Sequence, residues 1–305
     1  MSLAASIGLA VMVASQAATI ARIEPFWSWN TPIAWTGFIL FADAVVWRAR
    51  GNSWIRSNGR EFVVLALVSI PLWLVFEGYN LIIRNWYYTG LPANRVLRLF
   101  GYAWSFATIW PAIFEGAELV AILRAGRAEK PGARSYVAPS YVVSGFSRTR
   151  PALVVAIGVV LLITPFVVPA PARVYMAAPV WLGFIFLLDP LNAWLGTESL
   201  LVDLESGRAD RMLNLAFSGL LCGVLWEFWN YWAGAKWHYT VPIMEDLKIF
   251  EMPVPGYLGF PAFAIECFTM YVFVRAAFLR IASASAPSLS RLRRRDAQLV
   301  RTIAL

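Results

Sequence analysis

The sequence is poor in the side chains from which most metal and redox sites are built. Its 305 residues include one histidine and two cysteines, and only 14% of the residues are charged. The single histidine, His238, excludes multi-histidine iron clusters and bis-histidine haem ligation within one chain. Cys222 and Cys267 form no CxxC motif and no Cys/His array, so neither a zinc site nor a disulfide framework is indicated. We expect two free, buried thiols.

Sequence signatures of nucleotide binding and of common hydrolytic chemistry are also missing. The chain has no phosphate loop, dinucleotide fingerprint, nucleophile elbow or HExxH motif. Its net charge of +8 does not indicate nucleic acid, because the basic residues are sorted by loop, which is the signature of membrane orientation. We therefore expect no cofactor, no metal and no nucleic-acid partner.

Long apolar runs are what the sequence has instead. Hydrophobic residues make up 59% of the chain, and the mean hydropathy is +0.61. Several runs approach or exceed the roughly 20 residues that cross a bilayer as a helix, whose backbone satisfies its own hydrogen bonds. The predicted spans are 3–21, 32–47, 61–83, 101–123, 152–171, 176–196, 212–233 and 257–279. The chain is thus predicted to be an all-α polytopic membrane protein with about eight transmembrane helices.

One residue pattern occurs twice along the chain. The first copy comprises Trp35, Gly37, Phe38, Ile39 and Asp43, followed by Glu77, Asn80, Trp86, Tyr88, Thr89 and Pro92. The second comprises Trp181, Gly183, Phe184, Ile185 and Asp189, followed by Glu227, Asn230, Trp237, Tyr239, Thr240 and Pro242. In both copies the Trp-to-Asp spacing is eight residues, the Glu-to-Asn spacing is three and the Glu-to-Pro spacing is fifteen. The pattern predicts an internal duplication.

The duplication divides the chain into two membrane halves. We predict repeat 1 over 1–123, a basic cytoplasmic linker over 124–151, repeat 2 over 152–280 and a basic cytoplasmic tail over 281–305. With four helices in each half, both copies enter the membrane in the same sense, so the expected relation is a pseudo-two-fold axis along the membrane normal.

Charge predicts the orientation of the chain. Most of the basic residues fall in the even-numbered loops and the C-terminal region, which indicates a bacterial inner-membrane protein with both termini in the cytoplasm. The tail cluster Arg291–Arg295 is expected to contact anionic lipid headgroups.

Each half places a glutamate and an asparagine inside an apolar span. Glu77 and Asn80, like Glu227 and Asn230, are three residues apart and therefore share a helix face. An ionised carboxylate facing lipid costs several kcal/mol, so each glutamate must face the bundle interior, pair with a partner or hold a proton. Each glutamate and its asparagine are therefore candidate catalytic residues, with the glutamate as acid–base catalyst, and the alternative is a structural Glu–Asn hydrogen bond that ties helices together.

Aromatic residues surround the second of these glutamates. Trp226, Trp229 and Trp232 flank Glu227, and Trp237 and Tyr239 follow in the next loop. Indole faces attract cations and resist nucleophilic attack, so we predict that these five residues bind substrate. His238 lies between the last two and is expected to be an interfacial side chain without a catalytic task.

Further acids lie in the last span of each half. Glu115 follows Pro111, and Glu266 follows Pro261, and a proline within a span frees a carbonyl and often lies beside a polar cavity. Glu115 and Glu266 are therefore further candidate catalytic residues.

The remaining charges in the spans are expected to be structural. Glu118 is expected to be solvated or paired with Arg124. Asp43 and Asp189 are expected to pair with Arg or Asn across the repeats. Arg275 is expected to snorkel to the cytoplasmic interface.

The Trp226-Glu227-Phe228 sequence inside a span, with a second acid on another helix, resembles small integral-membrane isoprenoid cyclases. These include bacterial carotenoid (lycopene-type) cyclases and the membrane terpene cyclases of fungi. The resemblance covers only these residues, and the halves here have four helices where those families have about three. It implies that Glu227 protonates an alkene or epoxide with Glu266 as its partner.

Three functions follow from these patterns. The favoured one is an enzyme that processes a lipid-soluble, isoprenoid-like molecule by acid–base chemistry in a Trp-lined intramembrane cavity. A proton-coupled transporter of a small or lipidic solute would also use midplane acids within repeated halves. The third is a non-catalytic subunit of a membrane complex or a pigment-binding scaffold, in which the aromatic residues only pack.

Overall fold

The computed structural model describes residues 2–125 and 149–285, which are mostly helical and contain no closed sheet. Most of the predicted linker 124–151 and tail 281–305, including the Arg291–Arg295 cluster, lies outside the described residues. The long helices are α1 (Leu3–Ile20), α2 (Phe26–Arg50), α4 (Gly59–Ile83), α5 (Arg95–Ala125), α6 (Thr149–Val167), α7 (Ala177–Trp194), α9 (Asp210–Trp232) and α10 (Gly259–Ser285). The short elements are α3 (Trp54–Ser57), β1 (Trp86–Thr89), η2 (Ala170–Tyr175), α8 (Leu200–Glu205), β2 (Lys236–Tyr239), β3 (Lys248–Ile249), β4 (Met252–Pro253) and η3 (Val254–Leu258).

Six of the described helices are long and apolar enough to cross a membrane. They are α1, α4, α5, α7, α9 and α10, the last counted together with η3. The fold is therefore compatible with a multi-pass membrane protein. The structure supports six spans, so the larger number of eight stays a prediction. Of the other two long helices, α6 is a shorter apolar helix, and α2 has a non-helical residue, Trp29, three residues before Pro32.

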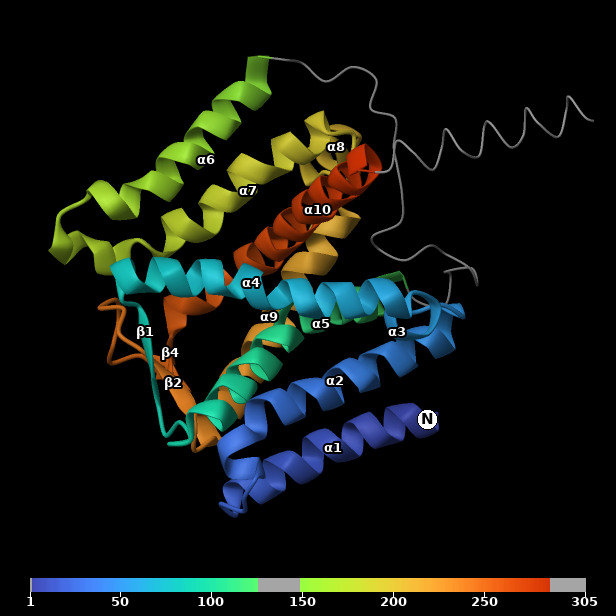
Figure 1. The fold of residues 1–305 in the computed structure, drawn as a ribbon, viewed down its shortest axis with the longest axis vertical. Coiled ribbons are helices and arrows are strands. Elements are labelled where there is room, and N and C mark those ends of the chain that lie inside the picture. The colour runs from blue at the N-terminus through green and yellow to red at the C-terminus, as the bar shows by residue number, and fades with distance from the viewer. Residues whose placement is uncertain (1, 126–148, 286–305) are drawn as a thin grey trace, which may run out of the picture.

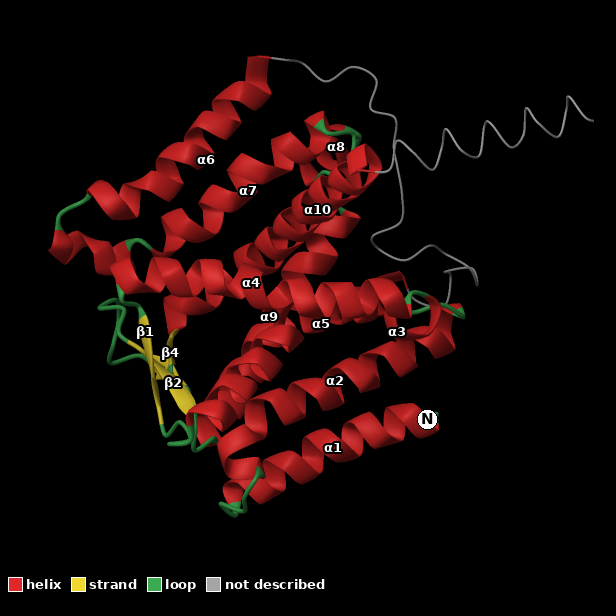
Figure 2. Ribbon diagram, viewed as in Figure 1, coloured by secondary structure: helices red, strands yellow, loops and turns green. Residues whose placement is uncertain are grey.

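The long helices pack in two groups with the same order of neighbours (Figure 1). In one group α1 packs on α2, α2 on α5 and α5 on α4. In the other, α6 packs on α7, α7 on α10 and α10 on α9. Figures 1 and 2 show α1 and α6 at opposite edges, with α4, α5, α9 and α10 between them and the short strands at one end. Contact between α5 and α9 joins the two groups.

Glycines allow the outer helix pairs to cross closely. A Cβ atom on Gly8 of α1 would lie 2.6 Å from the backbone oxygen of Gly37 on α2. In the pair α6–α7, a Cβ atom on Gly158 would lie 2.4 Å from the backbone nitrogen of Leu187. Small residues at such crossings let the backbones pack against each other, which is how helices associate in lipid.

The core lies where the central helices meet. Trp110 of α5 is fully buried, and its indole nitrogen donates to the carbonyl oxygen of Cys267 on α10 over 2.8 Å. Ser218 of α9 donates to the carbonyl oxygen of Ile113 on α5 over 2.7 Å. Both cysteines are free and buried, as expected.

The structure gives partners to two charged residues of the predicted spans. The Arg275 guanidinium contacts both carboxylate oxygens of Glu198 at 2.7 Å and one oxygen of Glu61 at 3.2 Å, a pairing that the sequence did not predict, and its position at the cytoplasmic interface stays a prediction. Glu118 is neither solvated nor paired with Arg124. It is buried and forms an ion pair with Arg50, because packing of α2 on α5 brings the two together.

The two repeated aspartates do not pair across the halves as expected. The Asp189 carboxylate accepts hydrogen bonds from the backbone nitrogens of Leu200 and Leu201, at the start of α8. The Asp43 carboxylate accepts from the backbone nitrogen of Ile55, at the start of α3, and pairs with Arg56 at 3.5 Å. Both aspartates satisfy backbone donors that a helix start leaves without an intrahelical partner.

Candidate functional site

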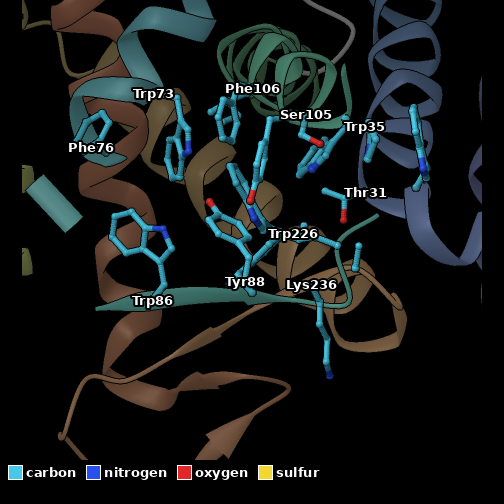
Figure 3. Close-up of a pocket in the computed structure, with 18 of the residues that line it drawn as sticks. Thr31, Trp35, Trp73, Phe76, Trp86, Tyr88, Ser105, Phe106, Trp226 and Lys236 are labelled. Atoms are coloured by element: carbon cyan, nitrogen blue, oxygen red, sulfur yellow. The ribbon is translucent and has the colours of Figure 1, made fainter. Parts of the chain in front are cut away.

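A two-stranded ribbon joins the two copies of the repeated Trp-x-Tyr motif. Strands β1 and β2 are antiparallel, with Trp86 opposite Tyr239 and Tyr88 opposite Trp237. Directly opposed residues in an antiparallel pair place their side chains on the same face, so all four rings share one face of the ribbon. Figure 3 shows Trp86 and Tyr88 rising from β1 towards the helices, while Lys236 points away.

Asn80 and Asn230 hold the ends of this ribbon. The Asn80 amide donates to the carbonyl oxygen of Trp86 over 2.8 Å and accepts from the backbone nitrogen of Asn85 over 2.8 Å. The Asn230 amide bonds both the carbonyl oxygen and the backbone nitrogen of Trp237, each over 2.9 Å. The two asparagines, predicted as catalytic, therefore use their amides to connect a helix end to the following strand.

Glu77 is surrounded by hydrogen-bond donors. Its Oε1 atom accepts from Trp73 Nε1 at 2.9 Å, from Trp86 Nε1 at 3.3 Å and from the Tyr88 hydroxyl at 2.5 Å. A carboxylate that accepts several donors is stabilised in its ionised form. Glu77 is therefore the carboxyl group that has the larger number of donors.

Glu227 occupies the equivalent place in the second copy but has fewer partners. Its Oε1 atom accepts from the Tyr239 hydroxyl at 2.8 Å, and that hydroxyl accepts from Trp237 Nε1 at 2.9 Å. Its Oε2 atom is buried and finds no hydrogen-bond partner among the described residues. Ionising a buried carboxyl with so few donors is costly, so this site favours the neutral acid.

The two tyrosines link the carboxyl groups to an aromatic cavity of about 140 Å³. This is close to the size of an engineered cavity of about 150 Å³ that holds benzene. The cavity lies between the ribbon and helices α2, α4, α5 and α9 (Figure 3). Its aromatic lining consists of Trp29, Trp35, Trp73, Phe76, Trp86, Tyr88, Tyr102, Phe106, Trp181, Trp226, Trp237, Tyr239, Phe260 and Phe263.

Three of the five predicted substrate-binding residues, Trp226, Trp237 and Tyr239, line this cavity. Trp229 is buried beside it and packs edge-on against Trp35, with ring centroids 4.8 Å apart. Trp232 does not line the cavity, and 41% of its surface is exposed. The structure thus places two of the five away from the lining.

The other predicted acids do not reach the cavity. Glu77 and Glu227 lie behind its tyrosines, but Glu115 and Glu266 lie elsewhere along α5 and α10 and are not part of its lining. Both are fully buried, and their carboxyl oxygens have no hydrogen-bond partner among the described residues. No hydrogen bond joins Glu266 to Glu227 in this part of the chain, so the pairing implied by the cyclase resemblance is not seen.

Sequence reasoning missed part of the site. Trp73 precedes Glu77 by four residues, a spacing that places the two side chains together on one helix face and could have revealed this contact. Trp86 and Tyr88 belong to the repeated motif, and the equivalence with Trp237 and Tyr239 could have marked them as site residues. The aromatic residues of α2 and α5 carry no such signal.

Burial and charge keep the two linking tyrosines protonated. Burial, followed by the negative charge of Glu77, raises the pKa of Tyr88 well above its ordinary value. Burial and the carboxyl group of Glu227 do the same to the pKa of Tyr239. Both hydroxyls therefore remain proton donors over the physiological pH range.

A charged cluster covers the outer face of the ribbon. Glu251 accepts from Lys236 Nζ at 2.7 Å and contacts His238 Nδ1 at 3.1 Å, and His238 Nε2 contacts the Thr89 hydroxyl at 3.1 Å. Burial raises the pKa of Glu251, but the hydrogen bonds and positive charge from Lys236 and His238 outweigh it, so the pKa lies below its ordinary value. The cluster fastens the 245–253 segment to β2.

Among the described residues, no group of three or more His, Cys, Asp or Glu side chains has the arrangement of a metal site. No protein-family model, curated protein or solved structure matches the chain.

Proposed function

We propose that the protein is an integral membrane enzyme that acts on an isoprenoid-like, lipid-soluble molecule by acid–base chemistry in the aromatic cavity. One observation carries the proposal. Two carboxyl groups with opposite hydrogen-bond environments, Glu77 and Glu227, are each bonded to a tyrosine that lines the same cavity. Such a pair supplies a base and an acid on one substrate, which is how environments divide two carboxyl groups between two roles.

Glu227 is the acid in this mechanism. When its carboxyl group is protonated, it donates to the Tyr239 oxygen, and the tyrosine hydroxyl hydrogen is free to point into the cavity. Tyr239 passes that proton to a substrate alkene and takes the proton of Glu227. The alkene π electrons form the new C–H bond, which leaves a carbocation on the neighbouring carbon. The faces of the surrounding indole rings stabilise this positive charge.

Glu77 is the base. Tyr88 gives its proton to the Glu77 carboxylate and takes one from a carbon beside the cation, and the electrons of that C–H bond form the new alkene. Glu227 has then lost one proton and Glu77 has gained one, so the substrate is isomerised or cyclised without an oxidant or other co-reactant. Proton transfer from Glu77 back to Glu227 restores the starting state.

We also propose how the helices are arranged in the membrane. Eight long helices form two tandem four-helix repeats about a pseudo-two-fold axis along the membrane normal, with both termini in the cytoplasm of a bacterial inner membrane and the basic tail against anionic headgroups. The identical order of helix neighbours and the matching roles of Asp43 and Asp189 support the repeat. The sorting of basic residues between loops supports the orientation.

Lipid extracts test the enzyme proposal. Expression of the chain in a host that lacks it is expected to change the isoprenoid profile. Glu227→Gln and Tyr239→Phe are expected to abolish that change, while the control Trp232→Phe, outside the cavity, leaves it intact. An unchanged profile in cells that contain the folded protein would refute the enzyme proposal.

Two other results would replace the proposal with one of its alternatives. Uptake of a solute into proteoliposomes that is lost in Glu227→Gln, with an unchanged lipid profile, would establish transport. The buried acids Glu115 and Glu266 are the observation that favours this second function, since intramembrane acids serve as proton relays. Co-purification with other membrane proteins in fixed stoichiometry would favour a scaffold.

A further inference from the structure

A second hollow lies beside the ribbon, next to the aromatic cavity. Its volume is about 290 Å³, and its walls come mainly from the segments at the starts of α7 and α10. The lining is almost entirely apolar. A hollow of this chemistry takes a hydrocarbon rather than a polar group.

The two spaces share a wall. Trp86, Trp181, Tyr239 and Met252 line both of them. Trp86 and Tyr239 are the opposed ribbon residues that bond Glu77 and Glu227, so the second hollow begins at the side chains that hold the two carboxyl groups. Met252 is the one side chain among the four without a ring, so the wall between the two spaces is least rigid at this residue.

Matching positions of the two sequence copies line the two spaces. Trp29, Thr31 and Pro32 precede Trp35 by six, four and three residues and line the aromatic cavity. Tyr175, Ala177 and Ala178 precede Trp181 by the same intervals and line the second hollow. At each of the three positions the residue in the second hollow is smaller, which agrees with its larger volume.

We propose that the second hollow binds the hydrocarbon chain of the molecule whose reacting end lies in the aromatic cavity. At the roughly 25 Å³ per carbon with which a 150 Å³ cavity holds benzene, the cavity has room for about six carbons and the second hollow for about twelve. The substrate class is therefore a long-chain isoprenoid of fifteen to twenty carbons. This inference rests on the proposed function, since it assumes that the aromatic cavity binds an isoprenoid.

Binding of radiolabelled isoprenols of five and twenty carbons to the detergent-solubilised protein tests the inference, because the aromatic cavity alone has room for the shorter one. Ala262→Phe fills the second hollow from α10 without adding atoms to the lining of the aromatic cavity. We expect it to weaken binding of the twenty-carbon alcohol at least tenfold and to change binding of the five-carbon alcohol less than twofold. Because each comparison keeps the ligand fixed, partition into the micelle cancels.

Two further variants guard against a folding defect. Ala177→Phe fills the same hollow from α7 and is expected to give the same result, while Ala17→Phe on the exposed side of α1 is expected to change neither affinity. If both hollow-filling variants bind the two alcohols as the unaltered protein does, the second hollow takes no chain and the proposed function survives. If the unaltered protein binds neither alcohol, the proposed function fails and the inference with it.

Discussion

Arg275 gives the sharpest test of what holds the bundle together. Its guanidinium lies between Glu198, which is 3% exposed and contacted through both oxygens at 2.7 Å, and Glu61, at 3.2 Å. The arginine therefore connects α10 to α4 and to the segment that leads into α8. Replacement by methionine keeps the apolar part of the side chain and removes the charge, which leaves the Glu198 carboxylate buried without its cation.

The expected cost follows from that burial. Removal of one partner from a buried ion pair destabilises a protein by about 3–5 kcal/mol, because the remaining charge is uncompensated. We expect Arg275→Met to lower the free energy of unfolding in mixed micelles by about this amount. The double variant Arg275→Met with Glu198→Gln is expected to recover most of the loss, because no buried charge is then left unpaired.

A matched exposed pair supplies the control. Asp210 is 84% exposed and contacts Arg124 at 3.3 Å, so Asp210→Asn is expected to cost less than about 1 kcal/mol. Urea or SDS titration followed by circular dichroism measures all three variants. The assignment of a stabilising buried ion pair would be refuted by either of two results. One is a loss in free energy of unfolding for Arg275→Met no larger than that for Asp210→Asn, and the other is a double variant as unstable as the single one.

Three further predictions concern the site and its supports. Tyr239→Phe and Tyr88→Phe each remove the hydroxyl that passes a proton between a carboxyl group and the substrate, so we expect each change to reduce product formation in lipid extracts about 10²-fold or more. Full product formation by either variant would contradict the assigned roles. Because the pKa of Glu251 is lowered in the folded protein, its contribution to stability is present above its ordinary value of 4.5 and is lost as the pH falls below it. The thermal unfolding temperature of Glu251→Gln should therefore fall less between neutral and acid pH than that of the unaltered protein. An equal fall in both proteins would contradict the assigned role of Glu251. Gly219→Leu is expected to prevent folding, since even a Cβ atom at this position would lie 2.2 Å from the Phe260 carbonyl oxygen. The measurement is loss of the monodisperse peak in size-exclusion chromatography, and the control is Gly59→Leu, where a Cβ atom would meet open space.

The sequence by itself determined where the long helices lie along the chain. Each predicted span coincides with a helix, because twenty apolar residues that must satisfy their own backbone hydrogen bonds have one regular structure available. The clearest difference is α2, which runs over Phe26–Arg50 rather than 32–47. The polar and aromatic residues at the two ends of α2 lie outside the apolar run but continue the helix. Hydropathy detects the apolar part of a helix and does not detect where the helix begins or ends.

The repeated motif also predicted part of the site. Equal spacing in the two copies marked Glu77 with Asn80 and Glu227 with Asn230, and in both copies the structure uses the asparagine to hold a strand and the glutamate to bond a tyrosine. Spacing within one helix fixes which side chains share a face, and this is local information.

Only the tertiary structure decided the partners. Nothing in the sequence pairs Glu118 with Arg50, places Trp86 opposite Tyr239, or separates the donor-rich environment of Glu77 from that of Glu227. A helix that is apolar on nearly all sides, such as α6, has no polar face to fix its rotation, so its packing on α7 is set by shape. Close crossings set those rotations, and some of them, such as that of Gly116 on α5 with Ser218 on α9, bring together residues more than a hundred positions apart in the chain.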